Sequence, residues 1–246
     1  MQDPQRTIGP DANLRAVLRE SGYAFVPAAG MRPQLQAVAG MDDWPIFSES
    51  WNDLPIDNYM ADHGRYRRRR HAVYSVAAGG EISRLPAQPH YQALDYNPVN
   101  GGIERWFEPV RADLGEGPSM RAVLGFCWQL FGAVAGSPSR AWKVEVHQFR
   151  IEAQGEAAGL PTPEGMHRDG VDYVLVLLVR RSNVRSGTTL IGSPDGAFRS
   201  SFTLASPFDA ALVDDHRVYH GVTPVEAINP AQPAWRDVLV VTFRQA

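Results

Sequence analysis

Short strand-like runs separated by turn residues fill the second half of the chain, and they constrain the fold more than any other feature. They are rich in Val, Ile, Leu, Thr and Phe, and Gly, Pro and Asp stand between them. Short strands with such punctuation are typical of a β-sandwich or a jelly roll. The run at 171–179 is apolar almost throughout, which indicates a central strand buried on both faces. The runs lie at 142–151, 171–179, 188–191, 202–204, 210–213, 217–222 and 237–244.

The first half of the chain has a mixed composition. At 119–135 the apolar residues fall on one broad face, which is the pattern of a helix packed on a core. A chain of 246 residues is long enough to bury one sizeable core. We therefore expect a single domain over 1–246, mainly β with flanking helices (α+β), in which 1–140 supplies the flank and part of the sheet and 141–246 the core. A strand is predicted at 23–26 and helices at 33–39, 103–114 and 119–135. A further short helix is predicted between a cap at Asp11 and an end at Gly22.

His167 and Asp169 stand two residues apart, immediately before the central run. Side chains alternate between the faces of a strand, so residues at this spacing project to the same side of the backbone. Chance alone gives roughly half of one such pair in a chain of this composition, so the neighbouring sequence decides its meaning. A second histidine, His220, follows in the run at 217–222. Two histidines and one carboxylate can hold an iron ion on one face and leave its other positions open, as in an oxygenase.

Two positions of this pattern have competitors. His216 shares the strand parity of His220 but lies in an Asp-Asp-His sequence that is typical of a turn. Arg236 opens the last run, where its guanidinium can form a two-pronged pair with the carboxylate of an organic acid. Arg244 has the same parity but lies about 26 Å away at ~3.3 Å per residue, so only one of the two can serve the site. We favour His220 and Arg236, and the alternative for Asp169 is a turn in which it binds backbone amides.

The sequence Arg-Tyr-Arg-Arg-Arg-Arg-His at 65–71 is the strongest charge run in the chain. If the strand that follows extends back through it, Arg67 and Arg69 share one face and can point inward. The run is then a solvated basic edge that blocks aggregation or a clamp for the carboxylate of a small acidic substrate. A nucleic-acid patch is the third alternative, which the absence of further basic charge around the run disfavours. His147 and Arg150 are further candidates for binding substrate, and a satisfied core histidine is the alternative for His147.

Composition narrows the class of protein. A net charge of −3 and a pI near 6.2 argue against a general nucleic-acid binder. The single cysteine excludes a disulfide framework. The sequence contains no apolar run long enough to cross a membrane and no early apolar segment of a signal peptide. We expect a soluble, cytoplasmic protein without a membrane partner, and the sequence leaves both a monomer and a homo-oligomer open.

Five motifs occur together in the second half. They are Val-His-Gln-Phe-Arg at 146–150, Gly-Met-His-Arg-Asp-Gly at 165–170, Gly-Thr-Thr-Leu-Ile at 187–191, Val-Tyr-His-Gly-Val-Thr-Pro at 218–224 and Arg-Asp-Val-Leu-Val-Val-Thr-Phe at 236–243. In order and approximate spacing this set resembles the bacterial iron(II)- and 2-oxoglutarate-dependent dioxygenases that hydroxylate free aliphatic L-amino acids, of the L-isoleucine 4-hydroxylase type. The basic segment before Tyr74 also resembles that family. The resemblance covers roughly residues 65–244 and depends on the whole set, since no single motif is specific.

The resemblance implies a double-stranded β-helix, the jelly-roll or cupin-like core, with Fe(II) held by His167, Asp169 and His220. It also implies that Arg236 pairs with the far carboxylate of 2-oxoglutarate and that Thr189 lies at this cofactor. The implied reaction hydroxylates a free aliphatic L-amino acid or a similar small molecule and releases succinate and CO2. Members of the family differ in the amino acid they accept, so the resemblance does not fix the substrate. The candidates for holding the substrate are Arg67, Arg69, His147 and Arg150.

Two other functions stay open at this point. A cupin-like module binds a metal or small molecule without turnover and needs neither a full triad nor a carboxylate-pairing arginine. An iron oxygenase that uses no cosubstrate would make Arg236 purely structural. Titration of the anaerobic iron(II) protein with 2-oxoglutarate separates both of them from the hydroxylase.

Overall fold

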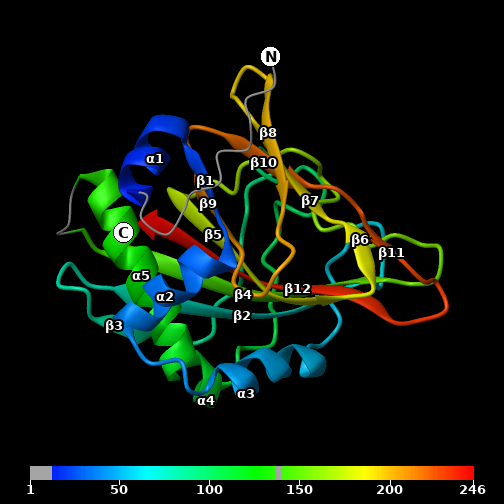
Figure 1. Ribbon diagram of the computed structural model, residues 1–246, viewed down its shortest axis with the longest axis horizontal. Helices are drawn as coiled ribbons and strands as arrows, with labels where there is room; N and C mark the ends of the chain where they lie inside the picture. Colours follow the sequence, from blue (N-terminus) through cyan, green and yellow to red (C-terminus); the bar gives the residue numbers. More distant parts are fainter. Residues whose placement is uncertain (1–12, 137–139) are drawn as a thin grey trace.

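A large antiparallel sheet runs through the middle of the computed structural model, which describes residues 13–136 and 140–246 (Figure 1). The strands within these residues are β1 (Tyr23–Val26), β2 (Arg67–Val76), β3 (Ile82–Arg84), β4 (Trp142–Ala153), β5 (Tyr173–Ser182), β6 (Val184–Ser186), β7 (Thr188–Gly192), β8 (Phe198–Thr203), β9 (Ala210–Asp214), β10 (Tyr219–Val222), β11 (Val225–Ala227) and β12 (Ala234–Gln245). Seven of these described strands form the large sheet, in the order β1-β9-β5-β12-β4-β2-β3. A three-stranded sheet, β10-β7-β8, and a two-stranded sheet, β11-β6, accompany it.

The central strands of the large sheet are long and buried on both faces. β12 pairs with β4 along its whole length and with β5 on its other side. In β5, Leu175 and Leu177 belong to one apolar core, whereas Val174 and Leu178 belong to another. The prediction of a central strand buried on both faces at 171–179 is therefore confirmed.

Helices cover one face of the large sheet, and the three-stranded sheet packs over part of the other face. On the helical face, Phe131 of helix α5 (Pro118–Ala135) contacts Phe243 of β12, with ring centroids 5.4 Å apart. On the opposite face, Ile191 and Phe202 of the small sheet share a core with Val238. Two packed layers of antiparallel strands with flanking helices make the jelly-roll, mainly β fold that the sequence predicts. The described helices are α1 (Leu14–Ser21), α2 (Ala28–Val38), α3 (Trp44–Glu49), the 3-10 helix η1 (Ser50–Asp53), α4 (Ala112–Gly115) and α5 (Pro118–Ala135).

The ends of two helices follow from their sequence. α1 begins after Asn13, whose side chain accepts a hydrogen bond from the Ala16 amide, and it ends at Gly22 in the left-handed conformation. α5 has Pro118 at its first position, where the missing N–H costs no helical hydrogen bond, and Gly136 after its end. The apolar face predicted at 119–135 is therefore the core face of a real helix.

The helix predicted at 103–114 is wrong for most of its length. Only α4 is helical there, and the preceding residues run extended, with Arg105 bridged to His90 and Pro109 bridged to His71. Ile103 and Trp106 are exposed at 51% and 56%, so these apolar positions form no core stripe. α2 also begins earlier than predicted, at residue 28 in place of 33. The extended course of 103–109 carries Arg105 into the interior.

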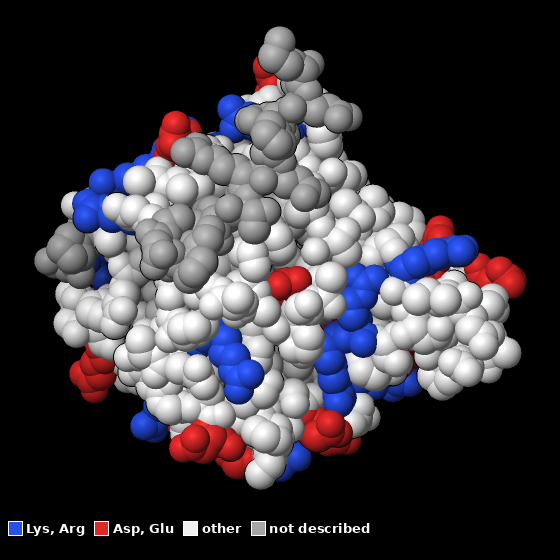
Figure 2. Space-filling model, viewed as in Figure 1, with Lys and Arg blue, Asp and Glu red and all other residues white. Residues whose placement is uncertain are grey.

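The basic run of β2 alternates as predicted. Arg67, Arg69 and His71 are buried, and Arg68 and Arg70 between them are partly exposed. One arginine face therefore points inward. Over the described residues of the face shown in Figure 2, basic and acidic side chains are interspersed among uncharged ones. In the described part of the chain, the helices are too short or too polar to span a membrane.

Candidate active site

His167 and His220 meet across an antiparallel bridge between the segment before β5 and strand β10. Each backbone amide donates to the carbonyl of the other residue, both at 2.9 Å. This bridge sets the two rings 4.6 Å apart between centroids. The Asp169 carboxylate reaches both rings, with Oδ1 3.7 Å from His167 Nε2 and Oδ2 3.4 Å from His220 Nε2. The structure thus brings the predicted triad together, with its ligand atoms within 4.8 Å of one another.

Asp215 clamps the loop that carries Asp169. Its Oδ1 accepts from the Asp169 amide at 2.9 Å, and its Oδ2 accepts from the amides of Gly170 and Val171 at 2.8 and 3.1 Å. Gly170 has a φ of 77°, and a Cβ at this position would lie 2.8 Å from the Tyr96 ring. Burial and the nearby Asp169 raise the pKa of Asp215. No sequence pattern indicated this role, because the composition around Asp215 is that of an ordinary turn.

The donor set of the triad fits a divalent metal ion. His167 Nδ1 donates to the Gly165 carbonyl at 3.0 Å, which leaves a lone pair on Nε2 toward Asp169. Burial opposes charge on Asp169, yet the two histidines hold the pKa of this carboxyl well below its usual value. Within the described residues, His220 Nδ1 is buried without a hydrogen-bond partner. Two imidazole nitrogens and a charged carboxylate that converge on one point are the ligands that suit iron(II).

The triad opens into a cavity on the face of the large sheet that lies away from the helices. β12 lines the cavity with every second residue, because successive side chains of a strand alternate between faces. Val238 and Val240 of β12 and Val174 and Val176 of β5 give it an apolar floor. Apolar walls with a few polar groups are typical of small-molecule sites. The charged or basic lining residues other than the triad are Arg67, Arg69, His90, Arg105, Lys143, Glu145, His147, Glu164, Arg236 and Arg244.

Arg236 presents a buried guanidinium to this cavity. It is 2% exposed, and its Nε and Nη2 lack a hydrogen-bond partner within the described residues. Burial and the nearby Arg181 lower its pKa to about 10, so it keeps its charge at neutral pH. Gly187, with a φ of 72°, packs against it, since a Cβ there would lie 3.4 Å from Arg236 Cδ. Arg244 is exposed near the other end of β12, so Arg236 is the better partner for a buried carboxylate.

Arg67 and Arg69 point from β2 into the same cavity and share the carboxylate of Asp57. Asp57 Oδ2 lies 2.8 Å from Arg67 Nε and 3.6 Å from Arg69 Nη1. Burial opposes charge on Asp57, but the two arginines lower its pKa. Arg69 also donates from Nη2 to His147 Nδ1 at 2.8 Å, and its Cζ lies 3.7 Å from the centroid of the Phe107 ring. One carboxylate therefore compensates two guanidiniums, which leaves positive charge for a bound anion.

The structure does not bring Arg150 or Thr189 to the cavity. Arg150 lies on the opposite face of β4 from His147, and its Nε and Nη2 bind the two oxygens of Asp237 at 2.7 Å each. Its guanidinium stacks on the Trp235 ring. Thr189 is buried in β7 and is not among the described residues that line the cavity. Neither residue has the contact predicted for it, because strand parity separates two faces but does not say which of them carries the site.

Replacing Asp237 by asparagine is expected to lower the free energy of unfolding by about 3 kcal/mol, because Arg150 and Arg180 lose a shared buried carboxylate. Asp237 is fully buried, and Arg180 Nε lies 3.1 Å from its Oδ2. Urea unfolding measures the change. The matched control is Glu226→Gln, which breaks an exposed ion pair with Arg185 and should change the value by less than about 1 kcal/mol. Equal effects of the two substitutions would contradict the structural role of Asp237.

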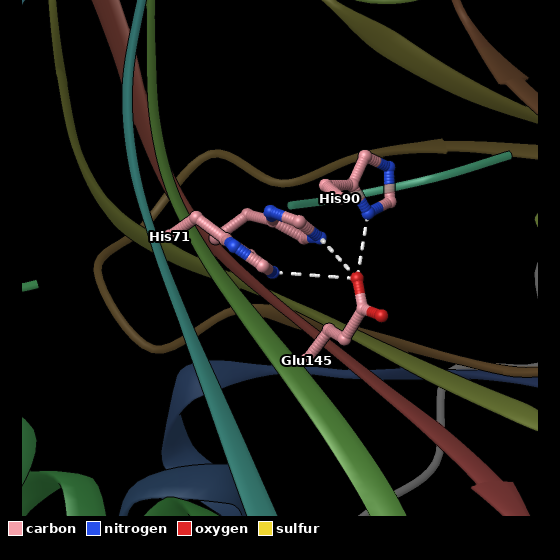
Figure 3. A group of neighbouring side chains, drawn as sticks. His71, His90 and Glu145 are labelled. Atoms are coloured by element: carbon pink, nitrogen blue, oxygen red, sulfur yellow. Dashed lines mark hydrogen bonds and ion pairs between the residues drawn. The ribbon is translucent and has the colours of Figure 1, made fainter. Parts of the chain in front are cut away.

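Glu145 and three histidines form a second group of side chains, of which Glu145, His90 and His147 line the cavity and His71 lies behind them in β2 (Figure 3). Glu145 Oε2 lies 2.6 Å from His90 Nδ1, 3.3 Å from His71 Nε2 and 4.0 Å from His147 Nε2. These residue types can bind metals, but Arg69 donates to Nδ1 of His147, so the neutral ring carries its proton on Nε2. His147 therefore turns an N–H toward Glu145 and no lone pair. We interpret the group as a carboxylate held by imidazole donors, which stiffens this wall.

Acid should destabilise the folded chain through the same group. Burial lowers the pKa of His90 to about 4 against the opposing effect of Glu145, and burial also lowers the pKa of His71 and of His147. Between pH 6.5 and 4 the unfolded chain then binds more protons than the folded chain. The free energy of unfolding therefore decreases as the pH is lowered through this range, by up to about 3 kcal/mol from His90 alone. Urea unfolding of the metal-free protein across this range should show the loss. His90→Asn should reduce the slope, and an unchanged slope would count against the assignment.

Comparisons with known proteins agree with this geometry. The model of the family described as 2OG-Fe dioxygenase matches residues 48–242, a span that includes the triad and Arg236. The 3(1)-hydroxy-L-isoleucine 4-dioxygenase of Pantoea ananatis is 26% identical over 235 residues, which cover 93% of this chain and 94% of the relative. The bifunctional enzyme flvA of Aspergillus flavus is 25% identical over 182 residues, which cover 65% of this chain and 22% of the relative.

Solved structures show the same fold. A bsmA homolog from Methylobium petroleophilum has a TM-score of 0.87 and 34% identity, and the match covers 99% of this chain and 96% of that one. IDO from Bacillus thuringiensis has a TM-score of 0.77 and 19% identity, covering 94% of this chain and 97% of that one. The chain therefore belongs to the 2OG-Fe dioxygenase family and is a non-haem iron enzyme that uses Fe(II) and 2-oxoglutarate.

Proposed function

We propose that this dioxygenase hydroxylates a free aliphatic L-amino acid and releases succinate and CO2. The observation that carries the proposal is that one cavity holds the triad together with buried guanidiniums at two separate places, Arg236 on β12 and the pair Arg67 and Arg69 on β2. A reaction between two organic acids, the cosubstrate and the substrate, requires two such places. The relative from Pantoea ananatis, whose name specifies a hydroxylated L-isoleucine, supports an amino acid as the substrate.

His167, Asp169 and His220 would hold the iron, and Arg236 would pair with the distal carboxylate of 2-oxoglutarate. When bound, iron and 2-oxoglutarate supply the oxidising chemistry that places one oxygen atom of O2 in a substrate C–H bond and the other in succinate. Three protein ligands leave the remaining positions of the ion open. The hydrogen bond from His167 Nδ1 to the Gly165 carbonyl fixes the orientation of that ring.

The rest of the cavity orients the two acids and keeps water away from the reacting carbon. The unsatisfied Nε and Nη2 of Arg236 can bind both oxygens of a carboxylate. Val238 and Val240 form an apolar surface between the Arg236 guanidinium and the far end of β12. On β2, Arg67 and Arg69 offer positive charge to the substrate, and His147 supports Arg69 from β4.

The test is a panel of the free L-amino acids, assayed for succinate release and product mass with iron(II) and 2-oxoglutarate. At least one aliphatic member is expected to release succinate in proportion to a product heavier by one oxygen atom. In anaerobic titrations, 2-oxoglutarate should produce a visible absorption band as it chelates the iron. A protein that binds iron but shows neither the band nor succinate would be a binding module, and this outcome would sink the proposal.

A further inference from the structure

Two buried polar atoms in the cavity have no partner and play no part in the function proposed so far. Glu164 Oε2 and Arg105 Nε are both inaccessible to solvent and lack hydrogen bonds within the described part of the chain. Both side chains line the cavity. Buried polar groups in native proteins are nearly always satisfied, and an unsatisfied charged group is especially unfavourable. Each of these atoms therefore indicates the place of a ligand group of opposite charge.

Arg105 is an unpaired cation next to the metal site. It is 1% exposed, and its Nη2 donates to Gln92 Oε1 at 3.0 Å. Gln92 in turn donates from Nε2 to Asp169 Oδ1 at 3.2 Å, so a single side chain connects Arg105 with a triad residue. Arg67 and Arg69 share Asp57, but among the residues that the structure describes Arg105 has no carboxylate in an ion pair. It therefore supplies positive charge that no described side chain pairs with directly.

Glu164 is a buried carboxylate with one oxygen, Oε2, that has no hydrogen-bond partner among the described residues. Its side chain is 8% exposed, and its Oε1 lies 3.5 Å from His167 Nδ1. Arg105 and Glu164 both line the cavity and both lie next to the triad, Glu164 through His167 and Arg105 through Gln92. The structure shows no hydrogen bond or ion pair between the two described side chains, so Arg105 Nε and Glu164 Oε2 are both available to a molecule bound in the cavity.

We propose that these two side chains form a subsite for the zwitterionic end of an amino acid, in which Arg105 binds the α-carboxylate and Glu164 binds the α-ammonium group. This inference rests on the proposed function and assigns its substrate recognition to two residues. Glu164 contacts His167, and Arg105 reaches Asp169 through Gln92, so the α-carbon would be anchored next to the triad. A buried Glu164 selects for a free amino group and against acids that lack one, because such an acid would leave Glu164 Oε2 without a partner.

The experiment is calorimetric binding to the anaerobic protein saturated with iron(II) and 2-oxoglutarate, in which no turnover occurs. The probes are the amino acid of the panel that binds most tightly, its deaminated acid and its decarboxylated amine. For L-isoleucine these analogues are 3-methylpentanoate and 2-methylbutylamine. Wild-type protein should bind the amino acid at least about tenfold more tightly than either analogue, since each analogue leaves one buried charge unpaired.

The variants separate the two contacts. Glu164→Gln should weaken binding of the amino acid by about tenfold and leave the affinity for the deaminated acid nearly unchanged. Arg105→Gln should weaken binding of the amino acid and of the deaminated acid by about tenfold and leave the affinity for the amine unchanged. Glu156→Gln, at an exposed position of the preceding loop, is the matched control and should change none of the three. Iron content and thermal stability of each variant are measured alongside, so that a loss of metal or of fold is recognised.

Three outcomes would overturn the inference. One is a wild-type protein that binds the amino acid and the deaminated acid equally, a result that requires no variant to fold. Another is a Glu164→Gln protein that binds the amino acid as the wild type does. In both cases succinate release with the amino acid would still uphold the hydroxylase. If none of the free amino acids binds or releases succinate, the inference and the proposed substrate class fail together.

Discussion

Replacing His220 by alanine is expected to weaken iron binding by more than about 100-fold and to abolish succinate formation. Even residues that only support metal ligands typically contribute 10–100-fold to affinity, so loss of a ligand should exceed that. The fold should persist, because the hydrogen bonds between His167 and His220 use backbone atoms that the substitution keeps. Iron content after anaerobic loading and succinate release measure the two effects. His167→Ala and Asp169→Ala should behave in the same way.

His216→Ala is the matched control, because the two histidines share strand parity and lie four residues apart in the printed sequence. The His216 side chain is 66% exposed, and its Nε2 lies 2.9 Å from Asp172 Oδ1, outside the triad. The variant should keep iron and turnover at the wild-type level. Retention of iron by His220→Ala, or an equal loss in both variants, would contradict the assignment of the triad.

Strand parity accounts for most of what could be predicted about the site. An interval of two residues puts His167 and Asp169 on one side, and the same rule turns Arg67 and Arg69 inward together. Parity also separates Arg150 from His147, and the structure confirms that separation. Strand parity does not predict which face of the large sheet borders the cavity, because that depends on where the helices and the small sheet pack.

The residues that sequence reasoning missed come from segments without a regular period. Arg105 lies in a stretch whose apolar spacing is typical of a helix but which runs extended beside His90. Glu164 and Asp215 lie in loops, and their roles depend on backbone amides or side chains from distant parts of the chain. Such contacts arise from the path of the backbone in three dimensions, so no local pattern indicates them. Once coordinates are known, buried polar atoms without a hydrogen-bond partner identify Arg105 and Glu164, and the amides that donate to its carboxylate identify Asp215.

Replacing Arg236 by methionine is expected to raise the Kd for 2-oxoglutarate by about 100-fold, since loss of one member of a buried charge pair typically costs 2–5 kcal/mol. The same substitution should leave the cosubstrate-free protein at least as stable as the wild type. Arg236 is 2% exposed with two unsatisfied nitrogens, and an apolar side chain of similar length removes that buried charge. Calorimetric titration with 2-oxoglutarate and thermal unfolding without it measure the two effects.

A charged residue that is positioned to bind a ligand lowers the stability of the ligand-free protein and raises the affinity for the ligand. Its replacement should therefore weaken 2-oxoglutarate binding without lowering the stability of the ligand-free protein. Arg244→Gln is the control, because Arg244 lines the same cavity from the exposed end of the same strand. Its loss should change the 2-oxoglutarate affinity little, as exposed charges contribute weakly. If Arg236→Met destabilised the empty protein by several kcal/mol and left the Kd unchanged, Arg236 would be a structural residue, and the cosubstrate would have to be held from another part of the cavity.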